Sequence, residues 1–511
     1  SGSVALGALT ALDKSTVKLE TLAVNMGISL NTVIAKGESR VELSSGAGIT
    51  AKDIDLEKSV LIANANGGIV LDGLTAKIAG SDVQLTAAGP VTAKDVLLDA
   101  CPLRITSTAG SITLGNVTAK KVLSLVELKA FTIIIAKIVD LESGPFTAIA
   151  QGNRIELGNV TARGAQVTLT AAAGTVKAGD VVLTPGRLTI TAGVVLQLGK
   201  LTATGSVANP AVVSLTAAGI TALDVDLTDC SLDATATNDI IGFGNVTARS
   251  KSDVTLTANA AAGKITLGNL TVLGPKATLA TTGEIVVKDV VLGHGLLQAT
   301  AGADITLGAV SAADVSSAVL DAIGNILMKG VGLAQSSLDA TAGGGIETDE
   351  LMAGASTLNI TAKTGNILVE SIGAGNGAVV KLIAGVTPGL GGNIVAGGDV
   401  SLNVGTLVVT ANNGSIALGP VTGIGKSSVT LTAGTHIAAG GATLDDSGFG
   451  ATAASIALGA VKASKGSTAA LAATGYIAVT GSVTVEELST FSATAGTGSI
   501  SLGAVSVSKG S

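Results

Sequence analysis

The two cysteines carry the most reactive side chains in this chain, and their spacing decides whether they can pair. Cys101 and Cys230 lie eleven residues before Ile112 and Ile241, which occupy equivalent places in a repeat of about 21 residues. Six repeats separate the cysteines, or about 29 Å at the spacing of neighbouring β-strands. A disulfide requires Cα atoms within about 7 Å. We therefore predict two unpaired thiols, buried in an apolar column, that only a bridge between molecules could join.

Recurring aspartates suggest a metal site, but their spacing argues against it. Five of them share one phase of the repeat: Asp53, Asp95, Asp180, Asp224 and Asp289. Aspartates of this phase recur every second repeat, about 10 Å apart at the strand spacing, too far to share a calcium ion with ligands at about 2.4 Å. We predict that each aspartate accepts a hydrogen bond from its own turn. Asp445 and Asp446 lie in a Gly-rich stretch, for which we predict a loop.

Five asparagines are each followed two residues later by threonine, which makes them acceptors for N-glycosylation. They are Asn116, Asn159, Asn245, Asn269 and Asn359, and the first four share one phase of the repeat. Gly-Asn suits a turn, so corner geometry explains these residues. In an organism that glycosylates, this edge would carry a row of sugars.

No group of residues predicts catalysis. Glycoside hydrolysis requires paired carboxylates in a cleft, and sugar grooves usually carry aromatic platforms, whereas this chain has six scattered aromatic residues among 511. His294 and His436 have no evident partners. Ice binding would require a flat face of repeated threonine, and the threonines of L-T-A and V-T-A are single positions beside alanine. We therefore predict no catalytic, cofactor-binding or metal-ligating residue, and we expect the protein not to be an enzyme.

Internal repetition dominates the rest of the sequence. The string SITLGNVTAK at Ser111 returns as RIELGNVTAR at Arg154 and as SIALGAVKAS at Ser455. Its first aliphatic residue, used here as a phase marker, recurs 24 times between Val4 and Ile500, mostly at spacings of 20 to 24 residues. The widest gap contains VTPGLGGN, which predicts a loop insertion near residues 385–393.

Two forms of the repeat largely alternate, so that the full unit is about 42 residues. One form reads I-x-L-G-x-V-T-A, the other resembles ITAKDIDLE at Ile49, and V-x-L-T-A segments lie between the markers. Strict alternation of apolar and polar residues predicts short strands, here three in each coil. One coil cannot bury its own inward face, but stacked coils can. The chain is therefore predicted to be all-β: one continuous β-solenoid domain over residues 1–511, with about 24 coils of about 21 residues.

Glycine recurs three residues after many markers, as in Gly115, Gly158 and Gly308. We predict that these glycines adopt positive φ at a corner of each coil. The core between the corners is expected to consist of short aliphatic side chains, like stacked on like.

Composition limits the partners of such a solenoid. Basic residues do not cluster and the net charge is −7, so nucleic acid is not expected as a partner. No uninterrupted apolar stretch approaches the ~18 residues of a spanning helix, and no membrane span is predicted. The content of Val, Ile and Leu is sufficient to bury a core, which argues against disorder.

The repeated pattern V-x-L-x-A-x-G-x-I-x-L, in coils of this length, resembles the repeats of filamentous haemagglutinin-like proteins over essentially the whole chain. The resemblance implies a right-handed, triangular, parallel β-helix and a large adhesin secreted by the two-partner route. Giant β-solenoid fibres of bacterial surfaces are an equally good relative.

The expected function is that of a structural extracellular fibre at the bacterial cell surface. The chain starts part-way through a coil, and neither end carries a polar cap. Since an open strand edge recruits another strand, we expect either copies stacked end to end or a longer continuous chain. The main alternative is an adhesin stalk that binds cell-surface glycans or neighbouring cells. A carbohydrate-active or ice-binding β-helix is a remote alternative.

Overall fold

The computed structural model describes residues 2–261 and 263–510 of the chain. In this part of the chain, the regular elements are β-strands throughout, with no helix. The residues form two compact units, 1–260 and 261–511, and each is described by itself. Each unit is a parallel β-solenoid, as the repeat predicts, with markers about 21 residues apart. That the chain is one continuous domain stays a prediction.

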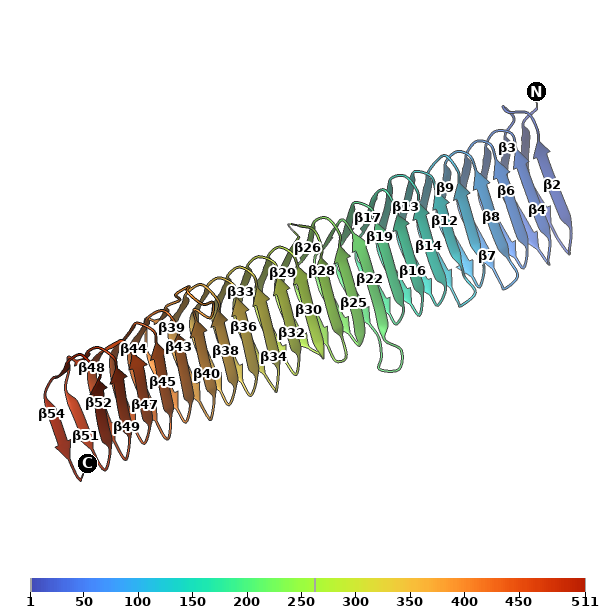
Figure 1. The fold of residues 1–511 in the computed structure, drawn as a ribbon. Coiled ribbons are helices and arrows are strands. Elements are labelled where there is room, and N and C mark those ends of the chain that lie inside the picture. The colour runs from blue at the N-terminus through green and yellow to red at the C-terminus, as the bar shows by residue number, and fades with distance from the viewer. Residues whose placement is uncertain (1, 262, 511) are drawn as a thin grey trace. The chain divides into compact units, whose positions relative to one another are not determined.

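Two sheets make up the first unit. Sheet A, which begins each coil, contains β1 (Val4–Ala11), β3 (Ile28–Lys36), β5 (Ile49–Glu57), β7 (Ile69–Lys77), β9 (Val91–Asp99), β11 (Ile112–Lys120), β13 (Ile133–Glu142), β15 (Arg154–Arg163), β17 (Thr175–Ala178), β18 (Val181–Thr184), β20 (Val195–Leu198), β21 (Leu201–Thr204), β23 (Gly219–Ala222), β24 (Val225–Thr228), β26 (Ile240–Phe243) and β27 (Val246–Arg249). Sheet B contains β2 (Thr16–Thr21), β4 (Arg40–Ser45), β6 (Val60–Ala65), β8 (Asp82–Ala87), β10 (Leu103–Ser107), β12 (Val126–Ala130), β14 (Pro145–Ala150), β16 (Gln166–Ala171), β19 (Arg187–Ala192), β22 (Ala211–Ala217), β25 (Cys230–Ala236) and β28 (Asp253–Ala258). The strands of sheet B lie side by side in Figure 1.

The second unit repeats this plan. Its sheet A contains β29 (Lys264–Leu273), β31 (Ile285–Gly293), β33 (Ile305–Ala313), β35 (Ile326–Ala334), β37 (Ile346–Gly354), β39 (Ile367–Gly375), β41 (Ile394–Ala396), β42 (Val400–Asn403), β44 (Ile416–Ile424), β46 (His436–Asp445), β48 (Ser455–Ser464), β50 (Ile477–Val479), β51 (Val483–Glu486), β53 (Ile500–Leu502) and β54 (Val505–Ser508). Its sheet B contains β30 (Lys276–Thr281), β32 (Leu296–Ala301), β34 (Ser317–Ala322), β36 (Ser337–Ala342), β38 (Thr357–Ala362), β40 (Val379–Ala384), β43 (Thr406–Ala411), β45 (Ser428–Ala433), β47 (Gly448–Ala453), β49 (Thr468–Ala473) and β52 (Thr490–Ala495).

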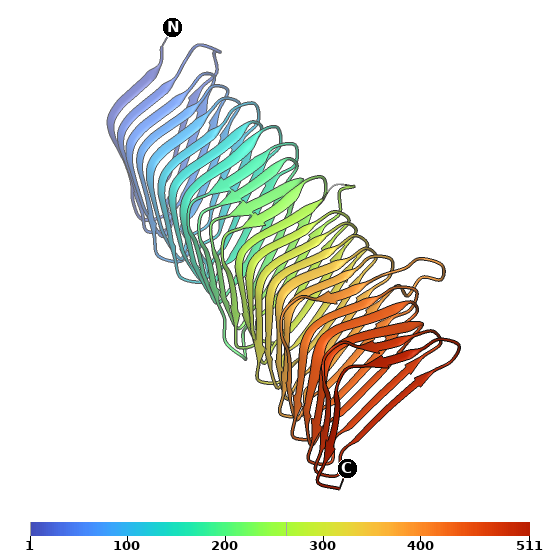
Figure 2. The ribbon, with the colours of Figure 1, turned by 90° about the vertical axis from the view of Figure 1, so that its left-hand side faces the viewer.

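The prediction of three short strands in each coil is wrong for most coils. The I-x-L and V-T-A segments usually join into one strand of nine residues that bends in the middle, as the blue strands of Figure 2 show. In β11, Ile112, Leu114, Val117 and Ala119 are buried, and an outward Gly-Asn pair lies between them. Two successive outward residues turn the strand without interrupting its pairing. Only in some coils, such as that of β17 and β18, is the strand divided.

The register of sheet A pairs the marker residue of each coil with the marker residue of the next coil. Ile112 pairs with Val91 on one side and with Ile134 on the other. In the second unit, Ile305 pairs with Ile326. These side chains are at most 1% exposed, so each column of the core is a continuous stack of aliphatic groups. This confirms the predicted core of like residues stacked on like.

The corner glycines serve close approach between coils rather than positive φ. Gly115, Gly158 and Gly308 do not lie in the positive-φ region, so that prediction is wrong. A Cβ built on Gly308 would instead overlap the carbonyl oxygen of Lys288 in the preceding coil, and Gly158 has the same relation to the preceding coil. Positive φ occurs at other corners, and mostly at residues with side chains, such as Lys58 (φ 50°).

Two segments leave the regular path of the coils. Residues 385–393, between β40 and β41, are irregular and include two glycines with positive φ, Gly385 and Gly389. Residues 205–210, between β21 and β22, form a loop that leaves the row of strands beside β22 in Figure 1.

The loop predicted around Asp445 and Asp446 is wrong. Asp445 is the last residue of β46, and only Asp446 and Ser447 separate this strand from β47. Asp446 has a positive φ of 51°, so the backbone turns within two residues. The Gly-rich stretch is therefore a tight corner between two sheets.

Replacing Gly308 by alanine tests the close approach of the coils. The added methyl group would push β33 away from the Lys288 carbonyl, and we expect the free energy of local opening to fall by about 1–3 kcal/mol. Hydrogen exchange of peptides covering β31 to β35 measures this change.

The matched control is Gly332→Ala in β35, where an added Cβ meets no atom within 4 Å. Its exchange should match the native chain or be slightly slower, because glycine loses more backbone freedom on folding than alanine. Equal protection in the two variants would show that the corner glycines are not needed for stacking.

Candidate functional site

A column of buried serines lines the corner that precedes the strands of sheet B. In the second unit, the backbone N–H of Ser316 donates to Ser336 Oγ (3.2 Å), and that of Ser336 donates to Ser356 Oγ (3.0 Å). The same hydroxyls donate to carbonyls of their own coils, Ser336 to Ala334 (2.9 Å) and Ser356 to Gly354 (2.8 Å). Each hydroxyl thus joins two coils while also donating to a carbonyl at the end of the preceding strand.

Both cysteines belong to this serine column. Cys101 stands two residues before Leu103, as Ser81 stands two residues before Val83, and these strands are paired in register. In the same way, the backbone N–H of Cys230 donates to a serine hydroxyl of the next coil. The cysteines are free and buried, as predicted. The predicted apolar column is wrong for Cys101, whose neighbouring position in the preceding coil is the hydrogen-bonded Ser81. Cys230 lies between Ala211 on one side and Ser252 on the other, so its surroundings are only partly apolar.

Burial makes both thiols poor nucleophiles. Cys101 Sγ donates to the carbonyl oxygen of Asp99 (3.0 Å), and loss of hydration raises the pKa of this thiol. The same loss raises the pKa of Cys230 to about 12. A reactive cysteine requires a lowered pKa and access to solvent. Neither thiol meets these conditions, and their role is to fill serine positions.

The aspartates and four of the glycosylation-type asparagines form one shared column at the bend of sheet A, whereas the fifth, Asn359, faces outward from β38 in sheet B and donates to Asp339 Oδ1. Asp95 Oδ1 accepts hydrogen bonds from Asn116 Nδ2 (3.0 Å) and from the Asn116 backbone N–H (3.4 Å). Asp224 Oδ1 accepts from the N–H of Asn245 (2.8 Å). Asp95, Asp180, Asp224 and Asp289 therefore bond to the next coil, and for these four the prediction that they bond to their own turn is wrong. They act as clamps between coils.

A second column of this kind precedes the markers of the second unit. Asn325 Oδ1 accepts from the N–H of Gly345 (2.8 Å), and Asn393 Oδ1 accepts from the N–H of Ser415 (2.9 Å). Sequence reasoning missed this column. The sequence does contain a pattern that could have predicted it, because an Asp or Asn directly precedes several markers: Ile305, Ile326, Ile367 and Ile394.

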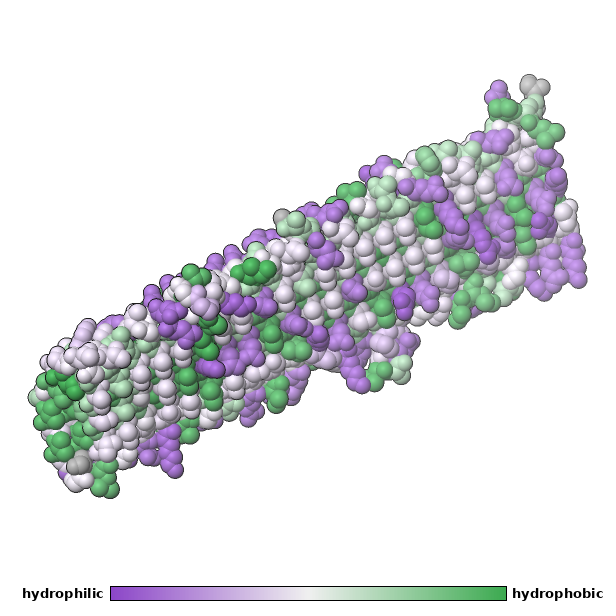
Figure 3. All heavy atoms as spheres, viewed as in Figure 1, coloured by the Kyte–Doolittle hydropathy of each residue, from purple (hydrophilic) through white to green (hydrophobic). Residues whose placement is uncertain are grey.

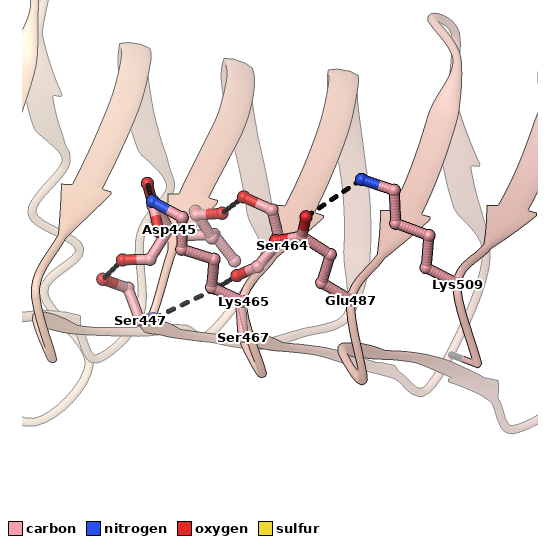
Figure 4. A network of polar contacts seen from close by, with 8 residues as sticks. Asp445, Ser447, Ser464, Lys465, Ser467, Glu487 and Lys509 are labelled. Atoms are coloured by element: carbon pink, nitrogen blue, oxygen red, sulfur yellow. Dashed lines mark hydrogen bonds and ion pairs between the residues drawn. The ribbon is translucent and has the colours of Figure 1, made fainter.

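Charged side chains also pair between successive coils. Lys465 Nζ lies 2.6 Å from Asp445 Oδ2, and Lys509 Nζ lies 3.0 Å from Glu487 Oε1 (Figure 4). The hydrogen bonds to these carboxylates raise the pKa of each lysine. Both lysine side chains are more than 60% exposed, and exposed pairs contribute less than about 1 kcal/mol. These pairs therefore add little to the free energy of unfolding, and their main effect is to favour the correct register between successive coils.

The histidines have partners, contrary to expectation, but no catalytic arrangement. His436 Nδ1 lies 2.9 Å from Ser455 Oγ, and His294 Nε2 lies 4.0 Å from Asp314 Oδ2 in an exposed pair. A serine nucleophile requires an oriented base and a site for the oxyanion. The interactions of the described residues supply neither one around Ser455.

The hollows in the surface differ in the charge of their lining: one of about 490 Å³ includes the carboxylates of Asp304 and Glu347, and Asp304 Oδ1 already accepts a hydrogen bond from the backbone N–H of Asn325. Another, of about 600 Å³, is an open groove over β33 to β44 whose lining includes Gly332, Met352, Gly373 and Thr422 and no ionisable side chain. Within residues 2–261 and 263–510, no three His, Cys, Asp or Glu residues gather closely enough to hold a metal ion.

The prediction that threonines occur only singly is wrong. Thr168 and Thr170 both face outward from β16, and Thr189 and Thr191 do so from β19. Strand register places the two pairs on each other. Sheet B of the first unit therefore carries threonine in rows.

The described residues include no helix of sufficient length and apolar character to cross a membrane. Comparison of the chain with protein-family models, with curated proteins and with solved structures gives no match. The conclusions about function therefore depend on the geometry of this chain alone.

Substitution of Cys101 tests whether its column is polar. We expect Cys101→Ser to be at least as stable as the native chain, since a hydroxyl donates to the Asp99 carbonyl better than a thiol does. Cys101→Val removes the donor and should be about 1 kcal/mol less stable than Cys101→Ser. Hydrogen exchange of β8 to β12 compares the two. Equal stability of both variants would favour the apolar column.

Proposed function

We propose that the protein is a structural element of an extracellular fibre on the bacterial cell surface. One observation carries the proposal: the polar side chains that could do chemistry are engaged in joining coils. The serine column, the two cysteines and the Asp–Asn column all bond across coil boundaries. A protein that commits its buried polar groups to stacking is suited to bear load.

The backbone ladder supports the same proposal. Seven residue pairs are in register between β11 and β13, and five between β10 and β12. Separating these two coils along the stacking direction requires all the ladder hydrogen bonds between them to break together. Each bond contributes only about 0.5–1.5 kcal/mol net, but their simultaneous loss is costly. The coils of each unit should therefore resist extension.

The pairing of β51 with β54 shows how one coil buries the outer face of another. Val505 and Val507 are 56% and 59% exposed, whereas their register partners Val483 and Val485 in β51 are 0% and 6% exposed. A further coil on β54, from the same chain or from another copy, would bury these valines. Fibre growth by either route uses the contact that already joins the coils.

An adhesin stalk is the second candidate, and the irregular segments favour it. Val207 in the 205–210 loop is 66% exposed, and Leu390 in the 385–393 segment is 49% exposed. Apolar side chains on loops that leave a rigid scaffold are suited to recognition. In this role the loops would contact cell-surface glycans or neighbouring cells.

Immunogold labelling of the producing cells tests the fibre proposal. Antibodies against the chain should label filaments on intact, unpermeabilised cells. Labelling only after permeabilisation would contradict an extracellular role.

Replacement of the two irregular segments separates the two candidates. Short glycine linkers would replace residues 206–209 in one variant and residues 386–391 in the other. Filaments should persist in both cases, because the ladder between coils is retained. Cell–cell adhesion is lost only if the chain is an adhesin.

A further inference from the structure

Outward positions of sheet B in the first unit carry a regular array of hydroxyl groups. From β14 to β28, each strand presents three outward residues that pair in register with those of the next strand. The row nearest the start of the strands includes the charged residues Arg187 and Asp253, whereas the other two rows, twelve residues in all, are mainly hydroxyl-bearing. Ten of the twelve residues are Thr or Ser. The first of these two rows contains Thr147, Thr168, Thr189, Ser214, Asp233 and Thr255, and the second contains Ile149, Thr170, Thr191, Thr216, Thr235 and Thr257. We call these twelve residues the threonine array.

The protein does not use these hydroxyls itself. In the described residues, none of the ten hydroxyl side chains of the array forms a hydrogen bond with another protein group, whereas Thr221 and Thr237, in the same coils but outside the array, donate to backbone carbonyls. Hydroxyls on neighbouring strands can bond to each other, as Ser337 does with Ser317 (2.9 Å). The array lacks such bonds, so its hydrogen-bonding capacity faces solvent.

The fold does not require threonine at these positions. Earlier in the same sheet, the equivalent outward residues are mostly charged or amide-bearing, such as Lys18 and Glu20 in β2 or Glu127 and Lys129 in β12. The inward residues stay mainly aliphatic throughout, with exceptions such as Phe146 in β14 and Ser45 in β4. Figure 3 shows the contrast: strongly hydrophilic atoms are common over the first strands of the unit, and the area over β16 to β28 is largely pale.

The spacing of the array is fixed in two directions by the sheet. Neighbouring strands lie about 4.8 Å apart, and alternate residues along a strand lie about 6.7 Å apart. The strands are held by the core and by the corner ladders, so the hydroxyls cannot move far from this grid. Each threonine offers a methyl group and a hydroxyl group, and the two rows present only one charged side chain, Asp233.

We propose that the threonine array binds ice. A rigid grid of uncharged donors and acceptors can bond to a partner whose own polar groups repeat at similar distances, and water in a crystal is such a partner. Ordering a liquid water costs up to about 2 kcal/mol, but the waters of ice are already ordered. Minerals would require arrays of charge and sugars would require aromatic platforms, which these rows do not offer.

The complete 511-residue chain tests this proposal by partition into slowly growing ice, with a soluble protein of similar mass as the excluded reference. We expect the native chain to enter the ice at a concentration at least about ten-fold above the reference. Thr191→Lys places a charge in the middle of the array. We expect at least about a ten-fold loss of partition because the charge must be desolvated against the ice.

The matched control is Asn64→Lys, which introduces the same charge at the equivalent outward position of β6. This variant should enter ice as the native chain does. Circular dichroism and thermal unfolding of both variants check that they remain folded. Thr191→Val, which keeps the shape and removes the hydroxyl, provides a variant without added charge and should show an intermediate loss.

Exclusion of the native chain from ice to the same degree as the reference overturns the proposal. Equal partition of Thr191→Lys and Asn64→Lys also overturns it, because binding would then not depend on the array. The other possible occupant of the array is a second copy of the chain, which sedimentation would detect. If the native chain self-associates, Thr191→Lys is monomeric, and neither enters ice, then the array contacts a second copy and the proposal is wrong.

Discussion

The fit of each coil onto the next is the constraint on which the rest of this structure depends. Backbone groups of parallel strands pair at about 4.8 Å, and the chain must meet this spacing at the corners as well as in the sheets. At the bend of sheet A, the carbonyl of one coil lies where a Cβ of the next would be, so the sequence has glycine at Gly115, Gly158 and Gly308. At the other corners, where the backbone turns and cannot continue the strand ladder, Ser, Asp and Asn side chains supply the hydrogen bonds between coils.

This constraint separates the residues into two classes. Inward residues and corner residues are determined by stacking, and their chemistry is used within the protein, as the hydrogen bonds of Cys101 and Ser336 show. Stacking does not determine the outward residues of the sheets or the residues of the loops. Function should therefore be sought on the outward positions of sheet B and in segments such as 205–210 and 385–393, rather than in columns of Asp or Cys that at first suggest metal or redox chemistry.

The repeat predicts the all-β solenoid and its aliphatic columns, because the alternation of residues such as Ile112 and Leu114 is local in sequence. The contacts between coils join residues about 21 positions apart, and local patterns do not show them. For this reason local patterns wrongly predict positive φ for the corner glycines and an apolar column around Cys101. They also wrongly predict that Asp224 bonds to its own turn. The 24-residue spacing from Leu196 to Ile220 shows that this coil is longer than the repeat of about 21, but spacing alone does not place the extra residues at 205–210. The two residues at the bend preserve strand pairing, which explains why two predicted strands are one.

A pair of engineered cysteines measures the coil register most directly. Ser317 and Ser337 are register partners on β34 and β36, so Ser317→Cys combined with Ser337→Cys should form an intrachain disulfide under mild oxidation, detectable by peptide mass spectrometry. Ser317→Cys combined with Asp339→Cys places the second thiol two residues out of register, about 8 Å away by strand geometry, beyond the reach of a disulfide. Efficient oxidation of this out-of-register variant, or failure of the in-register variant to oxidise, would contradict the stacked solenoid.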